Sequence, residues 1–390
     1  MDVVLFSNYI NHHQLPLAQA LNSLHGVNYT FVATTPFNIS RAQMGYKDEN
    51  KLFDFVLRTY EDEKQQEKAK FLATNADIVL VGSAPDYYME ERLKAGRITF
   101  HVSERYFKKG LSISTFPRYF ASAMKHIRPY QSMPLYYLCS SAYTAKDVCT
   151  FANFKDRCFK WAYFTEVFAS SDESISEKRK VNEVPVILWA GRFLSWKHPD
   201  AAIRVASKLK QQGYSFRLDL IGGGELEKEL KELTNKLNAD DVVRFLGFLP
   251  PEQVRTHMED ADVYLFTSDF NEGWGAVLNE AMSCGCAVIA SHACGASPYL
   301  VKDGENGFLY KDGDETQLLE KVIAVITDRN LRKRVGLQAY RDMVELWSPK
   351  VAAERLIQLN DAILHDSAET LYSEGPCSPA PILNNGWYNR

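Results

Sequence analysis

The chain has 390 residues, of which 46% are hydrophobic and 24% are charged, and its formal net charge is −4. This length suits two domains with separate cores, and the composition is typical of a globular protein, not of a disordered or fibrous one. The negative net charge argues against a dedicated nucleic-acid-binding protein, which would need a cationic excess to displace counterions from phosphates.

The first part of the chain alternates strand-like and helix-like segments. Near-continuous apolar runs predict strands over 2–7, 28–34, 76–82, 97–102 and 134–140. Helical patterns lie between them, at 14–24, 61–75 and 86–95, and at 142–152 after the last of these strands. Strands that are apolar along their whole length favour a parallel sheet covered on both faces. We assign residues 1–165 to this Rossmann-like domain.

The second part repeats the alternation after a polar linker at 166–184. Strands are predicted over 185–191, 216–222, 242–248, 262–268 and 287–291, which implies βαβ crossovers and a doubly wound α/β domain over 185–346. Two such domains leave a cleft that faces the carboxyl edges of both sheets, where ligands bind in this architecture.

Two segments follow the second domain. Residues 347–372 predict an amphipathic helix that packs back on the first domain. Residues 373–390 are rich in Pro, Gly and Asn and predict a loose tail.

The segment "NEGWGAVLNE" at 271–280 is the most informative motif. It follows a strand, so it lies at the carboxyl edge of the second sheet, and glycines there let the backbone approach a ligand closely. The helix that begins near Ala276 exposes unpaired amides, which suit an anion such as a diphosphate. The turn that would present these groups is Gly273, Trp274, Gly275 and Ala276.

Two glutamates bracket this segment. Glu280 lies about one turn into an apolar helix, where a carboxylate is costly unless it accepts hydrogen bonds. A ribose offers two adjacent hydroxyls, and Glu272 lies near enough to hold a sugar on the other side of a diphosphate. A solvated Glu280 and a loop acid Glu272 are the alternative interpretation.

Other stretches point to the same ligand. Arg192 and Lys197 in "GRFLSWK" follow the first strand of the second domain and could neutralise a diphosphate. The alternative interpretation is that they are two surface cations without a ligand. Gly223 in "IGGGELEKEL" and Phe248 in "FLGFLP" are candidate contacts to the nucleotide. The glycine turn lacks full G-x-G-x-x-G spacing and is weak evidence by itself.

Together these motifs resemble the C-terminal half of GT-B glycosyltransferases of the retaining, family-four type. The resemblance covers 185–312, through "GR…WK", "LIGGGE", "VRFLGFLP", "ADVYLFTSDFNEGWGAVLNEAMSCGCAVIAS" and "GASPYLVKDGENGFLY". It implies that Arg192 and Lys197 grip the donor diphosphate, that Glu272 lies near the transferred sugar and that Glu280 holds the ribose. It also implies metal-independent transfer, with a nucleoside-diphosphate sugar as donor and no cofactor.

The first domain departs from the family pattern. Where many relatives have a glycine-rich loop after the first strand, this chain has "SNYINHHQLPL", and Asn11 and His13 are candidate contacts to donor phosphate or acceptor. A histidine often follows a strand of this domain in the family. Here either His101 or Glu104 could hold that place, because strand alternation aims 101 and 104 to opposite sides.

We therefore expect a retaining glycosyltransferase that acts on a hydroxyl acceptor. A GT-B sugar-nucleotide epimerase, a phosphorylase and a catalytically silent nucleotide-sugar-binding subunit are the alternatives. Residues 105–128 contain six Arg or Lys and no acid, interleaved with aromatics. This pattern suits peripheral contact with an anionic membrane and a lipid-linked or surface glycan as acceptor. The alternatives are a solvated basic face whose aromatics are simply core, and a soluble acidic acceptor.

The remaining features concern the cellular location of the protein and its capacity to bind a metal ion. No run reaches the roughly 20 apolar residues that span a bilayer, and the N-terminus lacks the basic region of a signal peptide. The seven cysteines lack framework spacing and fit reduced cytoplasmic thiols. A zinc site is one interpretation of Cys284, Cys286, His292 and Cys294. Strand 287–291 separates the two pairs along its whole length, so we expect buried thiols and no metal site.

Overall fold

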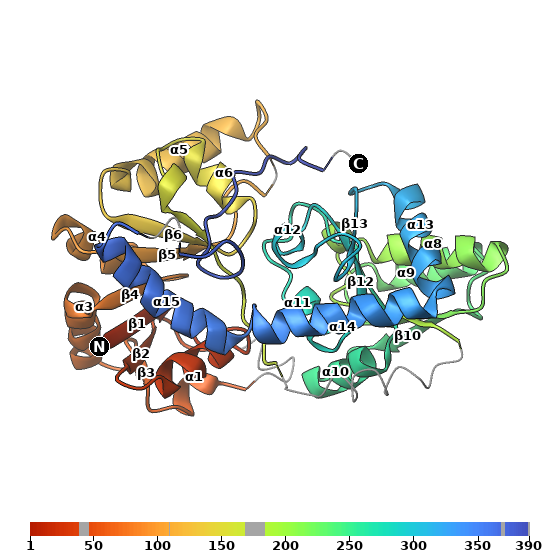
Figure 1. Ribbon diagram of the computed structural model, residues 1–390, viewed down its shortest axis with the longest axis horizontal. Helices are drawn as coiled ribbons and strands as arrows, with labels where there is room; N and C mark the ends of the chain where they lie inside the picture. The colour runs from red at the N-terminus through yellow and green to blue at the C-terminus, as the bar shows by residue number, and fades with distance from the viewer. Residues whose placement is uncertain (39–46, 109, 168–183, 368–370, 389–390) are drawn as a thin grey trace. The chain divides into compact units, whose positions relative to one another are not determined.

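The computed structural model describes residues 1–38, 47–108, 110–167, 184–367 and 371–388 (Figure 1). The chain divides into two compact units. Unit 1 contains Met1–Glu166 and Trp347–Asn384, and unit 2 contains Val167–Leu346 and Asn385–Arg390. Most of the predicted linker, 168–183, lies outside the described residues.

Unit 1 is built on a seven-stranded sheet in the order β3-β2-β1-β4-β5-β6-β7. All its strand pairs are parallel, and the strand order reverses beside β1. Its strands are β1 Asp2–Ser7, β2 Asn28–Ala33, β3 Val56–Arg58, β4 Ile78–Val81, β5 Thr99–Ser103, β6 Leu135–Cys139 and β7 Cys158–Lys160. β4 is buried at every position, as expected for a strand covered on both faces.

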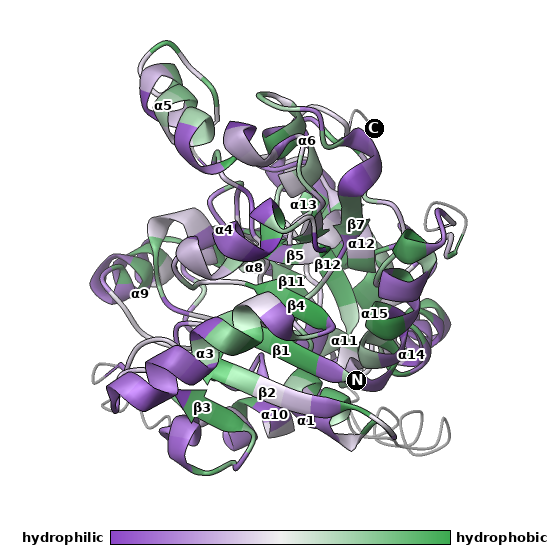
Figure 2. Ribbon diagram, turned by 90° about the vertical axis from the view of Figure 1, so that its left-hand side faces the viewer, coloured by the Kyte–Doolittle hydropathy of each residue, from purple (hydrophilic) through white to green (hydrophobic). Residues whose placement is uncertain are grey.

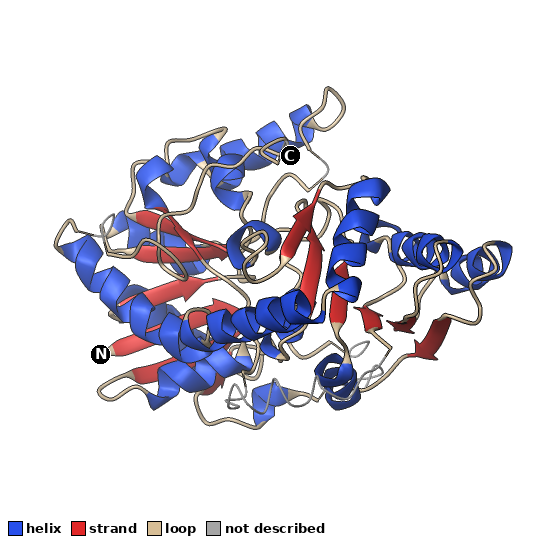
Figure 3. Cartoon of the chain, turned by 45° about the vertical axis from the view of Figure 1, so that its right-hand side comes forward, coloured by secondary structure: helices blue, strands red, loops and turns tan. Residues whose placement is uncertain are grey.

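Helices pack around this sheet, and several of them bury apolar side chains in its core (Figure 3). They are α1 Leu15–Ser23, α3 Glu63–Asn75, α4 Tyr87–Lys94, α5 Phe116–His126, α6 Thr144–Cys149 and α15 Pro349–Leu364. α15 packs against α1 although the two are far apart in sequence. Ser348 caps α15 by accepting a hydrogen bond from the Val351 amide, and Pro349 fits its first turn.

Unit 2 is built on a six-stranded sheet in the order β10-β9-β8-β11-β12-β13. Its strands are β8 Val186–Ala190, β9 Arg217–Ile221, β10 Val243–Gly247, β11 Val263–Phe266, β12 Ala287–Ser291 and β13 Phe308–Tyr310. Its helices are α8 Pro199–Gln211, α9 Glu227–Lys236, α10 Pro251–Asp260, α11 Val277–Ser283, α12 Ser297–Leu300, α13 Glu315–Thr327 and α14 Arg329–Glu345. The strands are parallel and the order reverses between β8 and β11.

The predicted fold class, two doubly wound Rossmann-like α/β domains, is confirmed. The sequence analysis does not contain β3, β7 or β13, each of which has three residues. So short a strand carries too little pattern to be separated from a loop.

The prediction of a loose tail over 373–390 is wrong for its described part. The Lys160 amide donates to Ser378 O at 2.7 Å and the Ala380 amide to Cys158 O at 2.8 Å, so the tail pairs antiparallel with β7. β7 is the edge strand of its sheet, and the tail covers backbone groups that would otherwise be unpaired there. Farther on, the Tyr388 hydroxyl donates to Leu309 O at 2.8 Å within unit 2.

Among the described residues, none of the helices combines the length and the apolar character needed to cross a lipid bilayer.

Candidate functional site

The reversal of strand order in unit 2 places two loops side by side. β8 and β11 are parallel neighbours, so the segment 191–198 after β8 and the segment 267–276 after β11 leave the same edge of the sheet. In doubly wound sheets this edge, at the reversal point, is where ligands bind. The four predicted residues Arg192, Lys197, Glu272 and Glu280 all lie on these loops or on α11, directly after them.

The structure brings Lys197 and Glu272 into contact. Lys197 Nζ forms an ion pair with Glu272 Oε2, and the two side chains are only 14% and 16% exposed. The Ser268 hydroxyl donates to the same carboxylate oxygen at 3.2 Å. A cation and an acid that are 75 residues apart in sequence therefore share one point at the carboxyl edge.

Arg192 lies in the same loop but is exposed. Among the described residues, no carboxylate pairs with its guanidinium. It is thus a cation available to an incoming anion at the edge where Lys197 is already paired.

The turn before α11 requires glycine at position 275. Gly275 has φ +90°, and a Cβ there would lie 2.3 Å from Phe266 Cζ, so no side chain fits. Trp274 is buried, and its indole Nε1 donates to Asn279 Oδ1 at 2.8 Å. The Trp274 ring therefore belongs to the core. Within the described chain, the amides of Gly273, Gly275 and Ala276 have no backbone acceptor.

Glu280 lies on the first turn of α11, which begins one residue after Ala276. Burial raises the pKa of this carboxyl to about 7, and the positive charge of Arg255 opposes the rise. No hydrogen bond to its carboxylate occurs within the part of the chain that the structure describes. A half-buried acid without a donor is costly in the free protein, and ligand hydroxyls would relieve that cost.

The remaining predicted contacts of unit 2 lie on the loops after β9 and β10. A Cβ on Gly222 would lie 1.8 Å from Gly191 O, so the first glycine of this turn is needed for close packing. Gly223 is different, because a Cβ there would meet only Glu227 Oε2, at 3.6 Å. Phe248 follows β10 and is 59% exposed, which leaves its ring open to a flat partner.

Three further side chains of this edge, those of Thr267, His198 and Asp269, were not predicted as site residues. The Thr267 hydroxyl donates to Lys197 O at 2.6 Å and accepts from Trp189 Nε1 at 2.8 Å. His198 Nε2 lies 3.5 Å from Asp269 Oδ2. The signal was the polar run "TSD" directly after a buried strand, which marks the carboxyl edge.

In unit 1, the loop after β1 is organised by Asn11. Asn11 Oδ1 accepts from the His13 amide at 2.9 Å, and Asn11 O accepts from the Gln14 amide at 2.8 Å, which shapes the entry to α1. The His13 ring stacks on Tyr163, with ring centroids 6.0 Å apart. Asn11 thus acts on the backbone, whereas His13 presents its ring at the edge of the sheet.

His101 and Glu104 have different surroundings. His101 Nε2 lies 3.1 Å from the Tyr106 hydroxyl, and burial lowers the His101 pKa to about 4. Glu104 accepts from the Tyr163 hydroxyl at 2.6 Å and from Lys108 Nζ at 2.7 Å. Tyr163, which the sequence analysis does not name, therefore links Glu104 to His13 within unit 1.

The zinc interpretation of the cysteine cluster finds no support. Within the described ranges, Cys284, Cys286, His292 and Cys294 do not gather at metal-ligand distances. Cys286 Sγ donates to Met258 O at 3.1 Å and Cys294 Sγ donates to Trp274 O at 2.8 Å. These are buried thiols with backbone acceptors.

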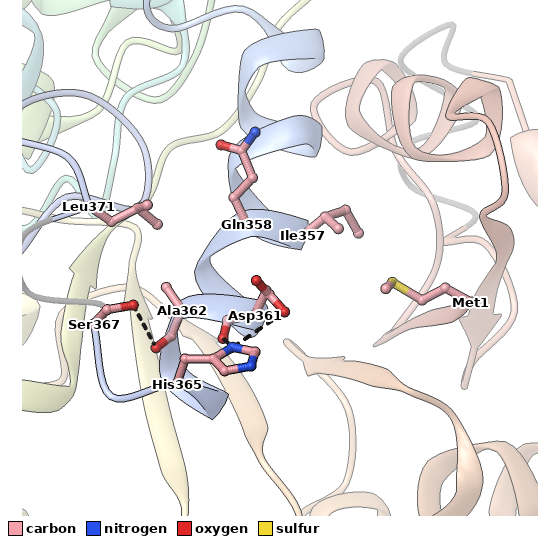
Figure 4. A pocket seen from close by; sticks show the side chains of 8 residues that line it. All are labelled: Met1, Ile357, Gln358, Asp361, Ala362, His365, Ser367 and Leu371. Carbon is pink, nitrogen blue, oxygen red and sulfur yellow. Dashed lines mark hydrogen bonds and ion pairs between the residues drawn. The ribbon is translucent and has the colours of Figure 1, made fainter.

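A pocket of about 470 Å³ lies elsewhere, in unit 1 (Figure 4). It is lined by α15, the chain start and the segment after α15: Met1, Ile357, Gln358, Asp361, Ala362, His365, Ser367 and Leu371. It contains none of the predicted site residues, and Met1 lies at the amino end of β1, away from the carboxyl edge.

Comparison with known proteins identifies the domain that carries the Lys197–Glu272 pair. Residues 170–342 match the family model described as "Glycosyl transferases group 1". The second unit is a glycosyl transferases group 1 domain. This match confirms the family resemblance seen in the sequence.

A curated relative is also similar to only one part of this chain. The amylovoran biosynthesis glycosyltransferase AmsK of Erwinia amylovora is 34% identical over 137 residues, which are 34% of this chain and 33% of AmsK. The chain thus spans about a third of the length of this relative.

Solved structures match nearly the whole chain. HepE of Anabaena in complex with UDP has a TM-score of 0.65 at 18% identity, over 94% of this chain and 99% of HepE. WaaG, described as a glycosyltransferase involved in lipopolysaccharide biosynthesis, has a TM-score of 0.60 at 15% identity, over 91% of this chain and 99% of WaaG. At these identities the likeness shows the fold.

Proposed function

We propose that the protein is a retaining glycosyltransferase that moves a sugar from a nucleoside-diphosphate sugar to a hydroxyl acceptor. The observation that carries the proposal is the meeting of Lys197 and Glu272 at the strand-reversal edge of a group 1 glycosyl transferase domain. The unpaired Glu280 carboxylate on the helix that follows extends the same edge. HepE, which has this fold, has been crystallised with UDP and with UDP-glucose.

Each residue has a chemical role in this proposal. Arg192 and Lys197 stabilise the charge that develops on the departing nucleoside diphosphate, assisted by the amides of the Gly273–Ala276 turn. Glu280 accepts hydrogen bonds from ribose hydroxyls, and Glu272 does the same for the transferred sugar. In this proposal Gly223 and Phe248 contact the nucleotide.

In the proposed transfer, the sugar keeps its anomeric configuration. The bond between the anomeric carbon and the diphosphate oxygen breaks, and the acceptor hydroxyl forms the new glycosidic bond on the same face. Its proton passes to the departing diphosphate oxygen. The cations supply the neutralisation that a metal ion would otherwise give, so the proposed transfer needs neither a metal nor a cofactor.

Unit 1 supplies acceptor-side residues in this proposal. Glu104 and His13 lie on loops that Tyr163 joins. The Glu104 carboxylate can accept a hydrogen bond from an acceptor hydroxyl, and the His13 ring can accept or donate one. His101 is neutral at pH 7 because burial lowers its pKa to about 4, so it acts only as a hydrogen-bonding group. Asn11 holds the loop at His13, because its side-chain Oδ1 accepts a hydrogen bond from the His13 backbone amide.

We also propose that unit 1 contacts an anionic membrane surface and that the acceptor is a lipid-linked or surface glycan. The structure shows that only some of the basic and aromatic residues of segment 105–128 are exposed. Arg105 is buried against Asp147 at 3.5 Å and Phe107 is buried, so both belong to the core, and Lys109 lies outside the described residues. An apolar patch remains exposed, together with cations such as Arg118 and Lys125.

This patch consists of Leu111, Ile113, Phe116 and Phe120, which are 44%, 97%, 47% and 42% exposed. Arg118 and Lys125 are exposed on the same helix, α5, which Figure 2 shows with hydrophobic and hydrophilic residues side by side. Exposed apolar groups beside cations suit insertion into an anionic lipid interface. AmsK and WaaG, by name or description, act in amylovoran and lipopolysaccharide biosynthesis.

A donor screen tests the proposed activity. The protein is incubated with UDP-, GDP- and ADP-sugars with and without glycan acceptors, and products are followed by mass spectrometry. Release of one nucleoside diphosphate that rises with acceptor supports transfer. Inversion at a sugar carbon without release would identify an epimerase, and binding without turnover would identify a silent subunit.

A further inference from the structure

Of three consecutive residues after β11, two bond to the turn that carries Lys197 and one bonds to Glu272. The Thr267 hydroxyl donates to Lys197 O at 2.6 Å, and the Asp269 amide donates to Trp196 O at 2.9 Å. Between them, the Ser268 hydroxyl donates to Glu272 Oε2 at 3.2 Å. Thr267 and Ser268 are both buried, so water does not compete for these bonds.

His198 completes this arrangement from the other loop. It adopts a left-handed backbone conformation with φ +47°, which is uncommon outside glycine and asparagine and lets the chain turn from Lys197 into α8. Its Nε2 lies 3.5 Å from Asp269 Oδ2, and its Nδ1 lies 3.9 Å from Asp200 Oδ1. Asp312, from the segment after β13, adds to the negative field at the ring.

We propose that Thr267, Ser268, Asp269 and His198 form a positioning clamp that sets Lys197 and Glu272 for the donor. The inference rests on the proposed function, because it assigns a role only if these two residues contact a nucleotide-sugar. Two contacts of the clamp end on the candidate site residues themselves, at the Lys197 carbonyl and at the Glu272 carboxylate. The other two fix the residues on either side of Lys197, namely Trp196 and His198.

The clamp has a protonation-dependent part. The hydrogen bond with Asp269 raises the pKa of His198, against the opposing effect of burial, and Asp200 and Asp312 act in the same direction as Asp269. A raised histidine pKa means that the charged pair is fully present below the ordinary histidine pKa. It is lost as the pH rises through the raised value. The donor site should therefore loosen on the basic side.

The test compares His198→Asn, Ser268→Ala and the control His365→Asn in the full-length protein. Asn tolerates the left-handed conformation, so His198→Asn removes the charge and keeps the turn. His365 is an exposed histidine that lies 3.6 Å from Asp361 in unit 1 and so repeats the pair away from this edge. The readouts are the donor kcat/KM from pH 5.5 to 8.5, the melting temperature, and the His198 imidazole titration by NMR.

The clamp predicts specific kinetic losses. Ser268→Ala should lower kcat/KM by about threefold to tenfold, since one hydrogen bond to the Glu272 carboxylate is lost. His198→Asn should lower it by about twofold to fivefold below the raised pKa and by little above it, because the pair is partly exposed. His365→Asn should match wild type, and Asp269→Asn should return the His198 titration toward its ordinary value.

Two results would overturn the clamp in different ways. If wild type turns over a donor while Ser268→Ala and His198→Asn keep its kcat/KM at every pH, the contacts serve only the fold. If wild type binds none of UDP, GDP and ADP and turns over no donor, the proposed function fails and the clamp's role fails with it. The first failure is seen only in the variants and the second already in wild type.

Discussion

Lys197 and Glu272 form an ion pair between the loop after β8 and the loop after β11, where strand order reverses in unit 2. In the free protein each side chain neutralises the other, and Ser268 adds a hydrogen bond to the carboxylate. A diphosphate would compete with Glu272 for the lysine, and a sugar hydroxyl would compete with the lysine for Glu272. The pair thus keeps both groups in place before the donor arrives.

Removal of either cation should depress transfer strongly. Lys197→Ala or Arg192→Ala should lower kcat/KM by about 100-fold, because a charge that stabilises the leaving group is lost from the transition state. The measurement is steady-state turnover of the donor found in the screen. Lys231→Ala, which breaks an exposed 2.7 Å pair with Glu227 on α9, is the matched control. A folded Lys197→Ala enzyme with normal turnover would contradict the assignment.

Glu280 should destabilise the fold above neutral pH. Burial raises its pKa from 4.5 to about 7, so the unfolded chain ionises first as the pH rises and stability falls between these two values. Glu280→Gln mimics the protonated acid and should be more stable than wild type at pH 8 by about 1–3 kcal/mol, and equal to it near pH 4.5.

Urea unfolding at both pH values measures this difference. Glu229→Gln, at an exposed position on α9, is the control and should change neither value. Equal stability of Glu280→Gln and wild type at pH 8 would show that the carboxylate is well solvated and has no need of a ligand.

Activity should survive chelation. Because Arg192 and Lys197 supply the neutralising charge in the proposed mechanism, incubation with EDTA should leave donor turnover unchanged, and added Mg²⁺ should not raise it. The measurement is the initial rate before and after dialysis against EDTA. Complete loss of activity that Mn²⁺ restores would mean that a metal ion takes part.

The apolar patch should bind anionic vesicles. In flotation assays the protein should rise with vesicles that contain anionic lipid, less so as salt shortens the screening length. Ile113→Ser with Phe116→Ser and Phe120→Ser should abolish flotation, because the exposed apolar area is lost. Phe71→Ser, at a side chain 64% exposed on α3, should float like wild type. Flotation that the triple substitution leaves intact would rule the patch out.

Periodicity and apolar runs predicted the longer strands of both sheets and several of the helices, because long buried strands leave a strong pattern, whereas the three-residue strands β3, β7 and β13 were missed. The same motif logic placed Lys197 and Glu272 at one edge, since βα loops of neighbouring strands must meet there. The clamp was beyond this reasoning. The bond from Thr267 to Lys197 O joins positions 70 apart, and only the folded chain shows which polar residues face each other.

The predictions for the tail and for Arg105 were wrong for the same reason. The tail looked loose because Pro and Gly favour irregular chain, but the edge of β7 offers backbone partners that local sequence does not reveal. Arg105 looked like a surface cation until Asp147, from another part of the fold, paired with it. Local composition describes a segment, whereas burial depends on what packs against it.

In the proposed function, the carboxyl edge of unit 2 binds a nucleoside diphosphate, and Glu280 accepts hydrogen bonds from the ribose. Calorimetric titration of UDP, GDP and ADP into wild type and Glu280→Ala tests it most directly. We expect wild type to bind at least one of the three, and folded Glu280→Ala to bind it more weakly by about 1.5–3 kcal/mol. Equal affinity in the two proteins, or no binding of any of the three to wild type, would contradict it.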